Sequence, residues 1–149
     1  MEHRFLLDVM LGKLTTYLRM CGYDTLYAHE EGIEADDEIR TRAASTDRTM
    51  ITRDRALAGR TDDAILLRSR DIEEQLSELY DHGIEIELPT YPDRCSVCNG
   101  RLVRLDPERR PEHAPDTVDR IWQCTECDQH FWKGSHWERV RETIATIPV

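Results

Sequence analysis

Residues 50–57 of the chain read MITRDRAL, a short apolar run that ends on a carboxylate between two arginines. The apolar start favours a buried strand over 49–52, and the alanine and leucine that follow favour a short helix over 55–58. Asp54 therefore stands where a strand ends and a helix begins. Two interpretations are open: Asp54 caps the short helix, or the strand delivers its carboxylate to a functional site.

The same alternation of strand and helix patterns runs through the first 90 residues. Leu11, Leu14 and Leu18 fall on one helical face, and Gly22 supplies a C-terminal stop for that helix. We expect strands over 4–8, 23–28, 49–52, 64–67 and 84–88, and helices over 11–21, 36–44 and 71–80. Alternating strands and helices predict an α/β fold, a parallel sheet flanked by helices.

Three carboxylates stand at one rim of this expected sheet. Asp8 ends the first strand, Asp54 follows the third, and Asp36 begins the second helix. Taken singly, each is explained as a helix cap. Taken together, they would repel one another unless a cation lay among them, and magnesium or manganese suits ligands that are all oxygen. Such an ion would activate a water and stabilise charge on a phosphodiester.

Two tight cysteine pairs mark the second part of the chain. Four thiolates at this spacing satisfy a structural zinc with no open position, so we expect zinc at Cys95, Cys98, Cys124 and Cys127. His113 and His130 are possible substitute ligands. Two disulfides are the alternative, but no secretion signal is evident and Cys21 is left over.

Pro89 and Pro92 bracket the point where the strand and helix alternation stops. We place a linker at 89–94, with an α/β domain over 1–90 and a zinc ribbon domain over 91–149. The second segment has few apolar residues, so it cannot rely on a hydrophobic core alone.

The charge is strongly acidic, −10 overall, and of 20 basic residues only Lys13 and Lys133 are lysines. This balance suggests a halophilic protein, kept soluble in high salt. Residues 1–90 carry a net charge of −9 and residues 91–149 a net charge of −1, so a polyanion would land on the second part. No stretch approaches the roughly 20 apolar residues of a membrane span, and we expect a soluble cytoplasmic protein without membrane contact.

Four stretches together resemble a known family: FLLDVMLGKLTTYLRMCGYDTLYA, ADDEIRTRAA, TMITRDRAL and FWKGSHWERV. They are similar to the Mut-seven C-terminal RNase domain family, which joins a PIN-like nuclease domain to a zinc ribbon. The resemblance implies a metal-dependent ribonuclease with magnesium or manganese at Asp8, Asp36 and Asp54. Asp37 is an alternative to Asp36. PIN domains commonly add a fourth carboxylate, for which Asp62, Asp63 and Asp71 are candidates.

Basic residues supply candidate contacts to RNA. Lys13 and Arg19 stand where the family motif is also basic, Arg53 lies beside the metal rim, and Lys133 and His136 lie among the tail aromatics. Each has a plainer explanation, as a solvated helix face, an ion pair or packing. We expect the Lys133 to His136 segment to contact phosphate or to close over the rim. A non-catalytic RNA- or protein-binding module that retains the PIN-like fold is the alternative function.

Overall fold

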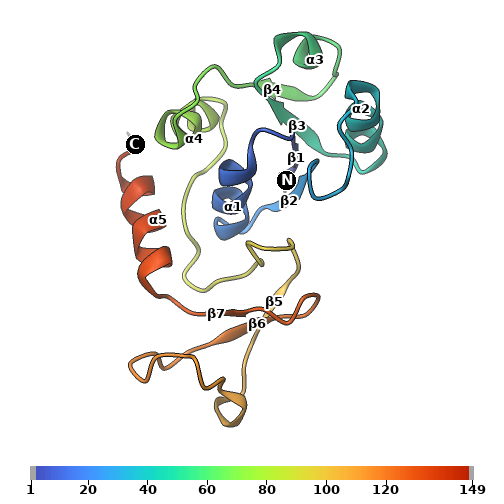
Figure 1. Ribbon diagram of the computed structural model, residues 1–149. Coiled ribbons are helices and arrows are strands. Elements are labelled where there is room, and N and C mark those ends of the chain that lie inside the picture. The colour runs from blue at the N-terminus through green and yellow to red at the C-terminus, as the bar shows by residue number, and fades with distance from the viewer. Residues whose placement is uncertain (1–2, 148–149) are drawn as a thin grey trace.

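Four parallel strands form the sheet in the first part of the chain (Figure 1), in a computed structural model that describes residues 3–147. The strand order is β2-β1-β3-β4, so the chain begins at the centre and builds outward on both sides. All three strand pairings are parallel, as the alternating pattern predicts. The strands are β1 (Arg4–Leu7), β2 (Asp24–Tyr27), β3 (Thr49–Thr52) and β4 (Ala64–Leu66).

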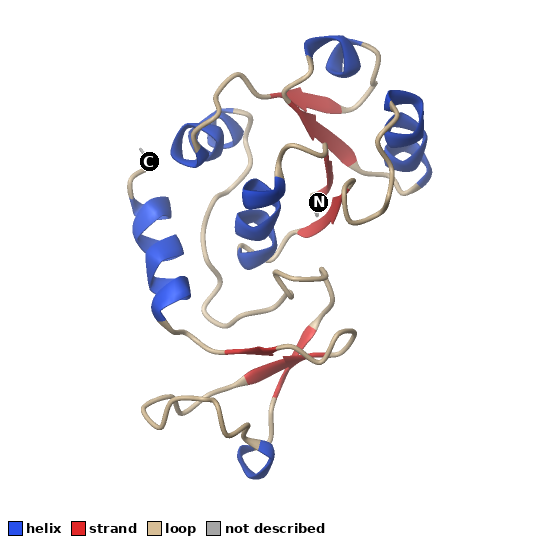
Figure 2. Ribbon diagram, viewed as in Figure 1, coloured by secondary structure: helices blue, strands red, loops and turns tan. Residues whose placement is uncertain are grey.

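Helices cover both faces of this sheet because successive strand residues point to opposite sides. Phe5 and Leu7 pack into the cluster beneath one helical layer, whereas Leu6 packs into the cluster beneath the other. No helix within residues 3–147 is long and apolar enough to cross a membrane. The first layer holds α1 (Gly12–Met20), α4 (Ile72–Asp81) and α5 (Ser135–Ala145), and the second holds α2 (Asp36–Ser45) and α3 (Arg55–Gly59) (Figure 2).

The predicted fifth strand over 84–88 is wrong. This segment has no strand structure, although Ile84 is buried and both Ile86 and Leu88 pack against the main core cluster. The Tyr23 hydroxyl donates a hydrogen bond of 2.7 Å to the Glu85 carbonyl, which holds the segment beside the sheet. Its apolar alternation therefore reflects a chain lying on the core without sheet pairing.

A small antiparallel sheet, in the order β5-β6-β7, forms the second part of the chain. Its own core is small, made of Leu105, Ala114 and Ile121. The cysteine pairs lie at the end of this sheet where β5 begins and β6 ends, in keeping with a zinc ribbon. The elements are β5 (Leu102–Arg104), the 3-10 helix η1 (Pro107–Arg109), β6 (Trp122–Cys124) and β7 (His130–Phe131).

The helix α5 returns from the ribbon to the α/β part and lies beside α4 (Figure 1). Trp137, Val140 and Ile147 belong to the same buried cluster as Phe5 and Leu7. The ribbon core is too small to bury the apolar face of this helix, so the face packs on the larger core. The division of the chain at residue 90 stays a prediction, with the qualification that α5 packs with the residues before that point.

Candidate functional site

A pocket of about 330 Å³ opens at the carboxyl ends of β1 and β3. Three of its lining residues are the carboxylates that the sequence singled out, from segments far apart in the chain: Asp8, Asp36 and Asp54. The parallel topology brings them together because the carboxyl ends of parallel strands share one edge of the sheet.

The buried hydroxyl of Thr52 links two of these acids. It donates to Asp8 Oδ2 at 2.8 Å and accepts the backbone N–H of Asp54 at 3.0 Å. The other Asp8 oxygen, Oδ1, accepts the N–H of Val9 at 2.8 Å. Thr52 has no exposed surface, so these bonds hold the two carboxylate-bearing segments in fixed relation. The sequence analysis missed this positioning residue.

The cap interpretation holds for only one of the three acids. Asp54 Oδ1 accepts the N–H groups of Ala56 at 2.9 Å and Leu57 at 3.2 Å, which caps α3. By contrast, α1 and α2 begin without a side-chain cap, so neither Asp8 nor Asp36 has that role. Capping therefore leaves two of the carboxylates at this rim unexplained.

The adjacent acids Asp36 and Asp37 point to different surroundings. Asp36 lines the pocket and pairs with Arg60 at 2.9 Å, with its side chain 43% exposed. Asp37 pairs with Arg40 one turn along the helix, and its side chain is 84% exposed. Of these two acids, Asp36 is therefore the one that faces the pocket.

Glu34 lines the same pocket and was missed by the sequence analysis. It precedes Asp36 by two residues, which was the available signal. The three candidates for a fourth carboxylate lie elsewhere. Asp62 and Asp63 line a separate pocket with Arg48, and Asp71 caps α4. Glu34 replaces them as the fourth acid of the rim.

Of the two basic residues predicted near the rim, one lines the pocket. Arg53 lines the carboxylate pocket, and its Nε is buried without a hydrogen-bond partner among the residues that the structure describes. Lys13 is exposed in the first turn of α1, two residues after Leu11, which also lines the pocket. Arg53 is therefore placed beside the acids, whereas Lys13 is not among the residues that line the pocket.

The donor set of the rim suits a hard divalent cation, because it consists of carboxylate oxygens. Asp54 uses Oδ1 for its cap, which leaves Oδ2 without a donor in the described part of the chain. The acids are nevertheless not gathered around one point. Within residues 3–147, the only group of three or more potential ligands whose atoms all lie within 4.8 Å of one another is the four-cysteine cluster.

That cluster has the dimensions of a structural zinc site. Tetrahedral zinc with bonds of about 2.3 Å to sulfur places neighbouring sulfurs about 3.8 Å apart. Here Cys95 and Cys127 have their Sγ atoms 3.7 Å apart, and those of Cys98 and Cys124 are 3.4 Å apart. All four thiols are free, so the disulfide alternative is excluded, and neither His113 nor His130 is needed as a ligand.

Backbone N–H groups near the sulfurs are placed to stabilise thiolates. The N–H groups of Glu126 and Cys127 point to Cys124 Sγ at 3.3 and 3.5 Å. Burial alone would raise the Cys124 pKa, but these bonds, together with hydrogen bonds from the thiols of Cys98 and Cys127, lower it. Burial raises the pKa of Cys95 to about 12, so a bound cation is what would keep its sulfur ionised. A Cβ on Gly100 would lie 2.7 Å from Cys124 Sγ, which requires glycine there.

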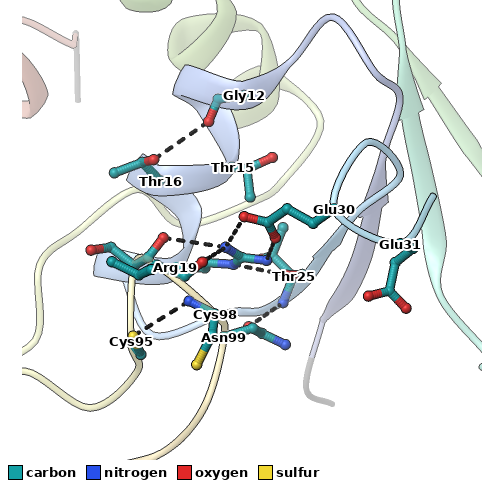
Figure 3. Close-up of polar contacts among 12 residues, drawn as sticks. Gly12, Thr15, Thr16, Arg19, Thr25, Glu30, Glu31, Cys95, Cys98 and Asn99 are labelled. Atoms are coloured by element: carbon teal, nitrogen blue, oxygen red, sulfur yellow. Dashed lines mark hydrogen bonds and ion pairs between the residues drawn. The ribbon is translucent and has the colours of Figure 1, made fainter. Parts of the chain in front are cut away.

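Arg19 connects the first cysteine pair to the α/β part (Figure 3). Its guanidinium is 2% exposed and pairs with Glu30 at 2.7 Å. It also donates to the carbonyls of Ser96 and Val97, each at 3.2 Å. Arg19 is enclosed and lies at the opposite end of α1 from the rim. Its contacts hold the ribbon against the α/β part, in place of the predicted contact with RNA.

Asn99 completes this contact on the edge strand β2 (Figure 3). Its Oδ1 accepts the Thr25 N–H at 2.9 Å, and its Nδ2 donates to Asp24 at 2.7 Å. Burial alone would raise the Asp24 pKa, but hydrogen bonds from Arg48 and Asn99 outweigh burial and lower it to about 2. The carboxylate of Asp24 is therefore ionised and stays paired at neutral pH.

The tail residues lie away from the rim. His136 lines a different pocket, which also contains Met20 at the C-terminal end of α1. Lys133 is exposed between the rings of Tyr91 and Trp137, with its Nζ 5.5 Å from each ring centroid. The prediction that this segment closes over the rim is therefore wrong, whereas a contact with phosphate stays a prediction.

The match to a family model agrees with this arrangement. The model of the Mut7-C RNAse domain matches residues 3–144, nearly the whole chain. The chain therefore belongs to the Mut7-C RNAse domain family. Searches of curated proteins and of solved structures find no match.

Proposed function

We propose that the chain is a metal-dependent ribonuclease that hydrolyses RNA phosphodiester bonds at the carboxylate rim, with a zinc ribbon that helps to bind the RNA. The family supports a nuclease-like role with RNA as substrate. The observation that carries the proposal is the convergence of Asp8, Asp36 and Asp54 in one pocket at the carboxyl ends of β1 and β3.

The residues of the rim divide into metal ligands and contacts to phosphate. Asp8, Asp36 and Asp54 would hold magnesium or manganese, with Glu34 as the fourth acid. The bound ion would activate a water and neutralise charge gathering on the phosphodiester. Thr52 keeps two of these carboxylates in position through its two hydrogen bonds.

The cations of the rim suit an anionic substrate. Arg53 brings a guanidinium, able to form paired hydrogen bonds with phosphate, into a pocket whose other charged lining residues are all acids. Its Nε has no protein partner in the described residues, so the group is not committed to an internal ion pair at that atom. We assign Arg53 and Lys13 to phosphate contact, where they would counter the negative charge of the first 90 residues.

The test is cleavage of end-labelled single-stranded RNA by the purified full chain, with zinc retained. We expect cleavage only when magnesium or manganese is added, and none from the Asp8→Asn variant at equal zinc content. RNA binding without cleavage under every divalent ion would instead support the alternative, a non-catalytic RNA-binding module. Cleavage by Asp8→Asn at the parent rate would contradict the proposed metal site.

A further inference from the structure

A second pocket, of about 340 Å³, lies between the ribbon and the C-terminal end of α1. We call it the aromatic pocket, because ring side chains line much of it: Phe131, Trp132, His136 and Trp137. Polar groups are present too, including Arg94, whose Nε is buried without a partner among the described residues. Apolar walls with a few polar groups are typical of sites for small ligands or flat rings.

A surface with two cations and one acid, which we call the Tyr91 surface, adjoins the aromatic pocket and is formed by Tyr91, Asp119, Arg120, Trp122 and Lys133. Tyr91 is 48% exposed, and the Arg120 guanidinium lies 5.0 Å from its ring centroid and donates to its hydroxyl at 2.8 Å. The Lys133 Nζ lies 5.5 Å from the rings of both Tyr91 and Trp137. Because Trp137 lines the aromatic pocket, Lys133 stands at the junction between that pocket and the Tyr91 surface.

The ribbon sheet joins the aromatic pocket to the Tyr91 surface. Trp122 borders the Tyr91 surface and Phe131 borders the aromatic pocket. These two residues are direct partners across β6 and β7, and paired residues of an antiparallel sheet point to the same face. One face of the ribbon therefore presents flat rings next to two cations.

We propose that the aromatic pocket receives one unpaired nucleobase of RNA while Lys133 and Arg120 contact the phosphates beside it. This inference rests on the proposed function and adds to it a base-binding subsite apart from the rim. Stacking on an aromatic ring favours binding of any unpaired base, because every base has a flat face. Single-stranded RNA is the fitting partner, because bases inside a duplex cannot leave the stack without cost.

Charge favours the same surface. The α/β part, with a net charge of −9 over residues 1–90, repels a polyanion, whereas residues 91–149 are nearly neutral. Leu11 lines the pocket at the rim and Met20 lines the aromatic pocket, at the two ends of α1. At about 1.5 Å per residue of helix, the two sites are about 14 Å apart. An RNA strand that occupied both sites would run along the molecule past this helix, anchored on the ribbon.

The test measures binding without cleavage. The full chain carrying Asp54→Asn, zinc-loaded and without added magnesium or manganese, is titrated with a fluorescent oligouridine of about 20 nucleotides, and anisotropy is followed. In that background we expect Lys133→Gln and His136→Ala each to weaken binding roughly 5- to 10-fold, in line with loss of one phosphate or stacking contact. Uridine monophosphate should also quench the tryptophan fluorescence of the Asp54→Asn protein.

The matched control is Arg109→Gln, which removes the same charge from an exposed position of η1 that lines neither the aromatic pocket nor the Tyr91 surface. We expect it to bind like the parent. Zinc content and melting temperature are checked for each variant.

Parent-like binding by Lys133→Gln and His136→Ala, equal weakening by Arg109→Gln, or no binding of oligouridine by the parent would each overturn the inference. Failure of the proposed function would look different. The chain would bind oligouridine through Lys133 and His136 but would cleave no RNA with any divalent ion.

Discussion

The two clusters of potential metal ligands lie near opposite ends of α1 and differ in how closely the chain alone assembles them. At the cysteine centre, four sulfurs lie within 4.8 Å of one another, and backbone N–H groups already point to them. At the carboxylate rim, the acids line one pocket, yet each is held by its own local partner: Thr52 for Asp8, Arg60 for Asp36 and the α3 backbone for Asp54.

This difference follows from the chemistry of the two donor sets. Neutral thiols can lie against one another, and a closed tetrahedral site is part of the fold. Ionised carboxylates repel, so without a cation they are stabilised by separate cations and N–H donors. The cysteine centre should therefore control stability, whereas the rim should control activity and tolerate substitution.

The largest effect is expected at the cysteine centre. Cys95→Ser removes a fully buried ligand, and zinc sites of this type contribute on the order of 10 kcal/mol to folding of small domains. We expect loss of bound zinc, measured by atomic absorption, and proteolysis of the ribbon under conditions where the parent is intact. Cys21→Ser, which changes the one cysteine outside the cluster, should keep one zinc per chain. A fully zinc-loaded Cys95→Ser protein would contradict this account.

The rim should show the reverse behaviour. Asp54→Asn keeps a good helix cap but removes the negative charge, so the melting temperature should change little while RNA cleavage falls at least about 100-fold. Asp37→Asn, at the 84% exposed neighbour of Asp36, should leave both quantities near parent values. Cleavage rates with manganese and thermal denaturation curves measure the two effects. Equal loss of activity in both variants would show that the rim assignment is wrong.

The contact between the two parts of the chain should have an intermediate effect. Arg19→Met leaves Glu30 and the carbonyls of Ser96 and Val97 without their buried partner, at a cost of about 3 kcal/mol. Unfolding in urea measures this change. Arg42→Met removes a surface pair with Glu31 and should cost less than about 1 kcal/mol. Equal destabilisation by the two changes would show that Arg19 does not dock the ribbon.

A smaller change tests how tightly the cysteine centre is built. In Gly100→Ala the new Cβ would lie 2.7 Å from Cys124 Sγ, so the sulfur must shift and zinc affinity should fall roughly 10-fold. At Gly59 a Cβ would meet nothing within 4 Å, and Gly59→Ala should leave affinity unchanged. Competition with a chromogenic zinc chelator compares the variants. Parent-like affinity in Gly100→Ala would mean that the centre is looser than its geometry indicates.

Features encoded locally were predictable from the sequence. The strands over 49–52 and 64–67 and the helix over 36–44 agree with the structure to within one residue. The strands are short apolar runs in a sheet covered on both faces, and the helix buries one apolar face. The C-x2-C spacing likewise fixes two ligands within one turn of chain, so the cysteine cluster was predictable without knowledge of the fold.

Features that depend on distant contacts were not predictable. The segment 84–88 has strand-like alternation but lies on the core unpaired, and the helix of Trp137 packs away from the ribbon that precedes it. Arg19 looked like a surface cation, because nothing in the local sequence reveals that a cysteine loop 77 residues later would cover it. Glu34 escaped notice because no periodic pattern marks a loop residue that lines a pocket.

The central claim, that the carboxylate rim holds a divalent metal, is tested most directly by crystals of the full chain grown with manganese, with diffraction data collected at the manganese absorption edge. The account predicts an anomalous peak in the pocket among Asp8, Asp36 and Asp54, and its loss in Asp54→Asn crystals. Manganese bound only elsewhere, in a protein that cleaves RNA with manganese, would contradict it.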